Sequence, residues 1–247
     1  MRGRVAVVTG ASRGLGKAIA MALSGAGARV ALVARDLDKL NQTASEIARA
    51  GGDARPFRAD VGDEQQVAAL ERAVLAEYGQ VQILVNNAGI NLRKPLVEFS
   101  LEEWNRVVNT NLTSVFLMCR AFVPHLKGRG YGRIINIGST MSWVSIPGRS
   151  AYSATKAAIL GITRALALEL ATEGVTVNAI CPGPFATELN TALLQDPKVS
   201  EWFMSRVPVG RWGRVEEVGA MVVYLCSEQA GFVTGTDLVI DGGWLAQ

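Results

Sequence analysis

The stretch that decides the fold is Thr9-Gly10-Ala11-Ser12-Arg13-Gly14-Leu15-Gly16, which follows an apolar run and opens a segment of helical period. Glycine lets the backbone turn sharply and approach a ligand closely. A pyrophosphate at such a loop would lie at the positive N-terminal end of the following helix. The arrangement predicts a dinucleotide site. The expected contacts are Gly10, Ser12, Arg13, Gly14, Leu15 and Gly16.

Outward from this loop, short apolar runs alternate with longer segments of helical period. The runs are Val5–Val8, Val30–Val33, Ile83–Val85, Ile134–Ile137, Val175–Ile180 and Leu238–Ile240, and the helical segments cover about residues 15–25, 38–50, 63–78, 101–126, 151–173 and 216–227. Strands that are apolar nearly throughout are typical of a parallel sheet covered on both faces. The alternation predicts one α/β domain over residues 1–247, a Rossmann fold with a doubly wound, mainly parallel sheet and helices on both faces. The proline-bearing segment 184–210 interrupts it and is expected to be a substrate loop.

Composition narrows the functional classes. The chain has 247 residues, 49% of them hydrophobic, and 25 Lys and Arg against 22 Asp and Glu. Such a balance, without a basic cluster, gives no reason to expect nucleic-acid binding. No apolar stretch reaches about 18 residues, and the N-terminus lacks a signal-peptide core, so we expect neither a membrane span nor export. Three scattered cysteines and a single histidine, His125, favour the cytoplasm and argue against a metal site.

The end of the second strand bears on the choice of cofactor. In NAD-binding folds an acidic residue at this tip accepts the ribose 2′-hydroxyl. Here the tip carries Ala34 and Arg35, and a guanidinium suits a 2′-phosphate. Arg13 in the glycine-rich loop adds a second positive charge. We therefore expect NADP(H) in preference to NAD(H), with the alternative that Asp36 takes the ribose while Arg35 is solvated.

A candidate acid–base pair lies further along the chain. Tyr152 and Lys156 are four residues apart on an expected helix, so they share a face. An ammonium beside a phenol lowers the pKa of the phenol from about 10 toward neutrality. Ser139 follows the run Ile134–Ile137 and should lie at the carboxyl end of a strand, where open α/β sheets bind ligands.

These motifs together resemble those of the short-chain dehydrogenase/reductase family, in the family's order and along the whole chain. They are Thr9-Gly10-x-x-x-Gly14-x-Gly16, Asn86-Asn87-Ala88-Gly89, Ser139, Tyr152-x-x-x-Lys156, Pro182-Gly183 with Thr187, and Asp241-Gly242-Gly243. The resemblance implies that Tyr152 exchanges a proton with the substrate oxygen and that Ser139 hydrogen-bonds that oxygen. Lys156 would also bind the nicotinamide ribose, and Asn111 would hold a water for proton relay.

The resemblance also implies the remaining cofactor contacts. They are Asp60 and Val61 at the adenine, Asn87, Ala88 and Gly89 at the end of the fourth strand, Tyr152 and Lys156, and Pro182, Gly183, Phe185 and Thr187 around the carboxamide. Because a nicotinamide carries the hydride, no metal is needed. The family is usually tetrameric, so we expect a homotetramer. The small residues of helix 151–173 could serve that contact or pack on the sheet.

Two subfamilies compete for the substrate, a small-molecule carbonyl or alcohol. Residues 109–116 resemble the 3-oxoacyl carrier-protein reductases, but Glu173 would repel an acidic carrier. Residues 93–95 and 206–213 resemble sugar-acid dehydrogenases of the gluconate type. Arg93 is then expected to pair with a substrate carboxylate, unless it is a surface arginine.

Two further alternatives stay open. A broad ketone reductase would use an apolar pocket, with candidate residues Met141, Trp143, Ile146, Leu189, Trp202 and Phe203. Met141, Trp143 and Trp202 are the substrate candidates we retain beside Arg93. A non-catalytic dinucleotide-binding regulator is disfavoured because Asn111, Ser139, Tyr152 and Lys156 are all present.

Overall fold

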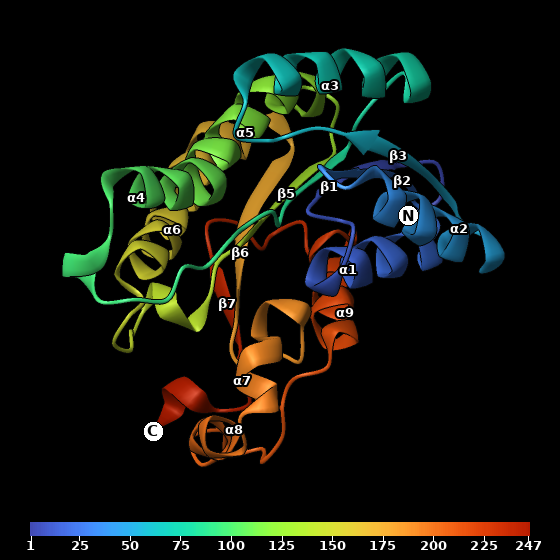
Figure 1. The fold of residues 1–247 in the computed structure, drawn as a ribbon. Helices are drawn as coiled ribbons and strands as arrows, with labels where there is room; N and C mark the ends of the chain where they lie inside the picture. The colour runs from blue at the N-terminus through green and yellow to red at the C-terminus, as the bar shows by residue number, and fades with distance from the viewer.

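A computed structural model, which describes residues 1–247 except the side chains of Leu189 and Ala192, contains one sheet of seven parallel strands (Figure 1). The strands are β1 (Val5–Thr9), β2 (Arg29–Ala34), β3 (Asp53–Arg58), β4 (Ile83–Asn86), β5 (Gly132–Ile137), β6 (Val175–Pro182) and β7 (Asp237–Ile240). Their order in the sheet is β3-β2-β1-β4-β5-β6-β7. The order reverses between β1 and β4, so their carboxyl ends open a crevice where such sheets bind ligands.

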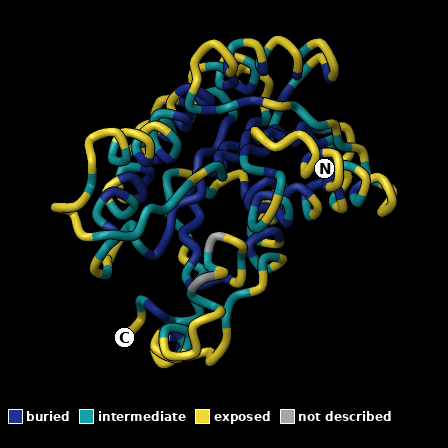
Figure 2. The backbone as a smooth tube through the Cα atoms, viewed as in Figure 1, coloured by how far each residue is buried: buried dark blue, intermediate teal, exposed yellow. Residues whose placement is uncertain are grey.

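Helices cover both faces of the sheet. One face carries α1 (Gly14–Gly25), α2 (Leu37–Arg49) and α9 (Val215–Leu225), and the other carries α3 (Glu64–Tyr78), α4 (Leu101–Val108), α5 (Ser114–Leu126) and α6 (Ser150–Leu170). Successive strand residues point to opposite faces: Val5 and Val7 join the core under α3, α5 and α6, whereas Ala6 and Val8 join the core under α1, α2 and α9. Figure 2 shows this buried sheet between the more exposed helices. The expected doubly wound α/β fold is confirmed.

The structure differs from the expected elements at two places, a strand that no apolar run marked and a helix that is interrupted. The edge strand β3 carries no apolar run, because its residues alternate between exposed and partly buried. The helix expected over 101–126 is interrupted by the π turn Asn109–Thr113. π turns within helices are often found at functional sites.

The substrate loop is largely helical. It contains the short helices η5 (Glu188–Asn190), α7 (Thr191–Gln195) and α8 (Pro197–Met204). Pro197 does not break a helix but begins α8, because the first helical turn tolerates proline. Both ends of the excursion meet, since Gly213 N donates to Pro184 O at 2.9 Å and Ala186 N donates to Gly213 O at 3.2 Å. The other single turns are η1 (Leu96–Glu98), η3 (Thr140–Ser142), η4 (Ala171–Glu173) and η6 (Trp244–Ala246).

The described residues also bear on membrane and metal binding. None of their helices is both long and apolar enough to span a bilayer. Within the same residues, no three side chains of His, Cys, Asp or Glu gather as metal ligands would. The cysteines Cys119, Cys181 and Cys226 are free and buried.

Candidate active site

A cavity of about 530 Å³ lies at the carboxyl ends of β1 and β4, and every residue expected to contact the cofactor lines it. The glycine-rich loop forms its floor. Gly10 and Gly14 have φ angles of 65° and 54°, which favour glycine. A Cβ on Gly16 would collide with the Gly10 carbonyl oxygen and the Asn87 amide. The loop can therefore pack against itself and Asn87 in this conformation only with glycine at position 16.

The N-terminus of α1 is left open toward this cavity. Three other helices begin at an aspartate whose carboxylate accepts backbone N–H groups: Asp36 before α2, Asp63 before α3 and Asp196 before α8. Helix α1 begins after Arg13, without a side-chain cap and without an acidic residue in its first turn. Its free N–H groups and positive dipole end suit a pyrophosphate.

The opposite wall is tied to the glycine-rich loop by hydrogen bonds. Thr9 Oγ1 accepts from Asn87 N at 2.9 Å and from Ala88 N at 3.0 Å, and Asn87 Nδ2 donates to Thr9 O at 2.9 Å. These bonds join the end of β4 to the end of β1. These hydrogen bonds fix the distance between the ends of β1 and β4, and thus the width of the crevice between them.

The adenosine end of the cavity presents a guanidinium. Arg35 Nη1 lies 3.6 Å from Asp60 Oδ2, and the Arg35 side chain is 69% exposed. Asp36 is engaged with α2, where it accepts from Lys39 N at 3.1 Å. That hydrogen bond, above all, lowers the pKa of the Asp36 carboxyl. Asp36 is thus occupied as a helix cap, although it lines the cavity together with Arg35.

Ser139, Tyr152 and Lys156 meet at the nicotinamide end, beside Pro182, Gly183, Phe185 and Thr187. Lys156 Nζ donates to Ile137 O at 2.6 Å and lies 5.7 Å from the centre of the Tyr152 ring. Burial lowers the pKa of Lys156 to about 8. Burial also raises the pKa of Tyr152, while the Ser139 hydroxyl and the charges of two arginines act in the opposite direction.

Asn111 lies in the π turn and is almost fully buried. Its Oδ1 accepts from Ile90 N at 2.8 Å, and its Nδ2 donates to Ile90 O at 2.9 Å and to Thr155 Oγ1 at 3.2 Å. The side chain therefore fixes the segment after β4 against α6. Its expected part in a water relay stays a prediction.

A second, smaller cavity of about 80 Å³ opens beside the first and shares Ser139, Tyr152, Gly183 and Asn190 with it. Its apolar walls are Met141, Leu193, Phe203, Trp212 and Trp244. Ser139 and Tyr152 thus lie between the large cavity and a small, largely apolar one.

The structure places the other substrate candidates differently. Trp143 is 52% exposed and does not line the small cavity. Trp202 does not line the small cavity either: its ring lies 3.9 Å from the Arg206 guanidinium and 6.0 Å from the ring of Trp244, which does line it. Their expected contact with substrate stays a prediction. The side chain of Leu189 is outside the described residues.

Arg93 lines neither cavity but contacts Asn190, which lines both. Its Nη2 donates to Asn190 Oδ1 at 3.0 Å, and Asn190 Nδ2 donates to Phe185 O at 3.0 Å. Arg93 is thus connected to the site through the substrate loop, and direct pairing with a substrate carboxylate stays a prediction.

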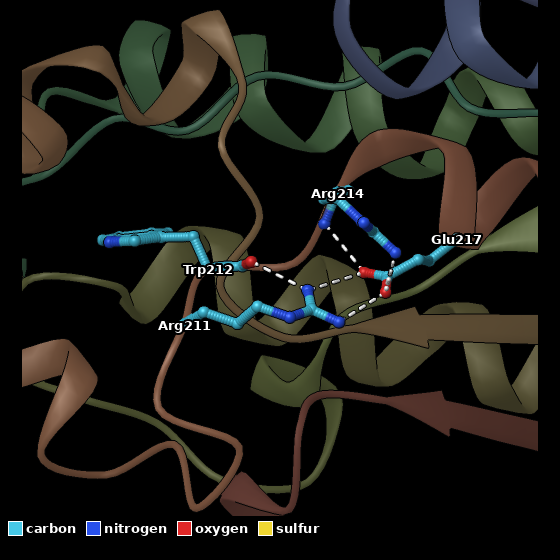
Figure 3. Close-up of polar contacts among 4 residues, drawn as sticks. All are labelled: Arg211, Trp212, Arg214 and Glu217. Carbon is cyan, nitrogen blue, oxygen red and sulfur yellow. Dashed lines mark hydrogen bonds and ion pairs between the residues drawn. The ribbon is translucent and has the colours of Figure 1, made fainter.

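Sequence reasoning missed Trp212, Trp244 and Arg149 as residues of the small cavity. The loop that carries Trp212 is fastened to α9: Arg211 Nη2 donates to Glu217 Oε1 at 2.6 Å, and Arg214 N donates to Glu217 Oε2 at 2.8 Å (Figure 3). The Arg211 hydrogen bond contributes most to lowering the pKa of Glu217 to about 2. No local sequence pattern predicts that Trp212, on this distant loop, lines the small cavity.

Comparison with known proteins agrees with this geometry. A family profile described as enoyl-(acyl carrier protein) reductase matches residues 10–245. The gluconate 5-dehydrogenase of Gluconobacter oxydans (strain 621H) is 39% identical, covering 98% of this chain and 95% of that protein. The 3-oxoacyl-(acyl-carrier-protein) reductase of Haemophilus influenzae is 37% identical, covering 98% of each chain. The crystal structure of a gluconate 5-dehydrogenase from Burkholderia cenocepacia J2315, in complex with NADP and tartrate, has a TM-score of 0.96 at 37% identity, covering 100% of this chain and 97% of that chain.

Proposed function

Because the chain belongs to the short-chain dehydrogenase/reductase family and is an oxidoreductase acting on CH–OH groups with a nicotinamide dinucleotide, we propose a narrower function for it. It interconverts a small ketone, of the gluconate sugar-acid class, and the corresponding secondary alcohol, with NADP(H). The observation that carries this proposal is that Ser139 and Tyr152 line both cavities, with Lys156 beside them in the larger one.

Each of these residues has a separate role at the substrate oxygen or beside it. When bound, the nicotinamide supplies or accepts the hydride. Tyr152 donates its proton to the carbonyl oxygen during reduction and takes the alcohol proton during oxidation. Ser139 hydrogen-bonds the same oxygen. Lys156 places a positive charge beside Tyr152, which favours the phenolate, and Asn111 keeps the segment around Ile90 in place.

Preference for NADP(H) is supported by charge at the adenosine end. Arg35 lies at the cavity mouth, and Arg13 stands at the start of α1. Asp36, the alternative ribose acceptor, is held by Lys39. A relative of known structure, the enzyme from Burkholderia cenocepacia, was crystallised with NADP.

A sugar-acid substrate is supported by relatives named gluconate 5-dehydrogenase and by the cationic surroundings of the small cavity. The second candidate is a 3-oxoacyl thioester, favoured by the relative from Haemophilus influenzae. Glu173 counts against an acidic carrier protein. It lies beside Gly128, whose N donates to Glu173 O at 3.1 Å, in the region where a carrier would need basic residues.

The test is oxidation of NADPH in the presence of 5-ketogluconate, acetoacetyl thioester or a simple aromatic ketone, each repeated with NADH. We expect the highest kcat/KM with 5-ketogluconate and NADPH. A clear preference for the thioester would replace the sugar-acid proposal with the acyl one. Equal low rates on all three would favour a broad ketone reductase.

We also propose that the enzyme works in the cytoplasm as a homotetramer. Three of the small residues of α6, namely Ala157, Gly161 and Ala165, are exposed, and a Cβ on Gly161 would meet open space. Leu168 on the same helix is 82% exposed. An apolar face of this kind is suited to close helix pairing between subunits. Sedimentation at the mass of one subunit would contradict the assembly.

A further inference from the structure

Arg149 is a buried cation at the substrate side of the site. It precedes the first residue of α6, is 7% exposed, and lines the small cavity. Its Nη1 is buried without a hydrogen-bond partner among the described residues. No aspartate or glutamate occurs among the described residues that line this cavity. A buried arginine normally has an anionic partner, because burying an unpaired charge is costly.

The surroundings make this position still less favourable for a lone cation. Arg149 lies at the N-terminus of a helix of 21 residues, where the helix dipole is positive. The charge of a second arginine, Arg93, acts on it as well. Burial, and secondarily the charge of Arg93, lowers the pKa of Arg149 to about 10. A bound anion would offset the cost of burying Arg149 and its repulsion by the helix dipole and by Arg93.

The anion that fits is not supplied by the cofactor. The large cavity, which holds the glycine-rich loop and the N-terminus of α1, is not lined by Arg149 among its described residues. Arg149 immediately precedes α6 and Tyr152 follows three residues later in its first turn, and both line the small cavity. An anion at Arg149 would therefore belong to the molecule whose carbonyl oxygen reaches Tyr152.

We propose that Arg149 binds the carboxylate of the substrate and determines the preference of the enzyme for oxo acids over uncharged ketones. The inference rests on the proposed function and adds to it a specificity-determining residue. The planar guanidinium can give a carboxylate two parallel hydrogen bonds, which a lysine in its place could not. The aromatic wall formed by Phe203, Trp212 and Trp244 then faces the rest of the molecule.

The test separates anion binding from turnover. Binding of tartrate, a dicarboxylate probe, is measured by calorimetry on the NADP-saturated enzyme, and kcat/KM is measured for acetoacetate and its methyl ester. Arg149→Gln is expected to weaken tartrate binding about tenfold or more and to raise the KM of the acid but not of the ester. Arg149→Lys should recover only part of the affinity. Arg129→Gln, which removes an exposed arginine, is the matched control.

The outcomes are distinguishable. Unchanged tartrate affinity in Arg149→Gln, with NADP binding retained, would overturn the inference. So would a shifted pH profile of kcat with equal effects on acid and ester, because Arg149 would then act only through the charge state of Tyr152. If the wild-type enzyme prefers the thioester while tartrate binding still depends on Arg149, the anion site stands and the sugar-acid function falls.

Discussion

Replacing Arg35 with alanine is expected to weaken NADPH binding by about 5- to 30-fold while leaving NADH binding unchanged. The side chain projects from the end of β2 into the mouth of the larger cavity. NADPH and NADH differ only by the 2′-phosphate, so a residue that contacts this group affects one cofactor alone. The two dissociation constants therefore measure its role directly.

The magnitude follows from the exposure and existing partner of Arg35. A hydrogen bond between charged groups contributes about 1.5–3 kcal/mol. Arg35 is 69% exposed and already pairs with Asp60 at 3.6 Å, so part of this contribution is lost to solvent and to the competing carboxylate. An exposed pair of that kind contributes only about 0–1 kcal/mol. The net loss is about 1–2 kcal/mol, which is the stated 5- to 30-fold.

Fluorescence titration of both cofactors at two salt concentrations measures the effect. Arg55→Ala serves as the control. Arg55 lies on β3, is similarly exposed, and pairs with Glu77 at 3.4 Å. The loss caused by Arg35→Ala should shrink at high salt, because salt screens exposed charges. Equal weakening of NADPH and NADH would refute the reasoning, because Arg35 would then support the loop rather than the phosphate.

Three other substitutions test proton transfer by Tyr152, the charge of Lys156 and the glycine-rich loop. Tyr152→Phe should lower kcat by a factor of about 10² or more while NADPH binding stays within about twofold, which a stopped assay and a titration check together. The pKa of Lys156 is lowered to about 8, so its charge is lost as the pH rises through this value, and kcat/KM for ketone reduction should fall there. In Lys156→Arg any remaining activity should persist to higher pH, and an unmoved alkaline limb would count against the assignment. Gly16→Ala should reduce Tm and cofactor affinity together because its Cβ meets the Gly10 carbonyl, whereas Gly25→Ala, whose Cβ meets open space, should leave affinity unchanged.

The fold was largely readable from the sequence because its strands are buried on both faces. Such strands are apolar nearly throughout, and six of the seven were located from runs alone. The seventh, β3, lies at the sheet edge and reads Asp53-Ala54-Arg55-Pro56-Phe57-Arg58. An edge strand with alternating exposure needs no apolar run, so composition could not mark it.

The boundaries that were wrong have local causes. Pro197 interrupts a periodic pattern in the sequence, yet it occupies the first turn of α8, with Asp196 as the cap. The same residue type stops a helix at one position and begins one at another. The π turn Asn109–Thr113 leaves the helical period on both sides intact, so no periodicity argument reveals it.

The site divides in the same way between local and distant residues. The glycine-rich loop and the pair Tyr152 and Lys156 could be proposed because each functions through spacing along one element. Arg149 precedes an expected helix and carries no such signature. Trp212 and Trp244 reach the small cavity only after the chain has folded back from α8 and β7. Which face such residues present is decided by tertiary packing.

The hydrogen bonds between Pro184, Ala186 and Gly213 close the segment that carries α7 and α8 into a loop with its two ends together. Its two ends are joined by backbone atoms, while the side chains of Asn190 and Arg211 fasten it to the rest of the protein near those ends. Extra residues within such a closed loop cost little, since the entropy of closure grows only slowly with length. We therefore expect that transplanting residues 191–210 from a relative alters which compound is reduced, while the cofactor-binding residues, Thr187 included, remain intact.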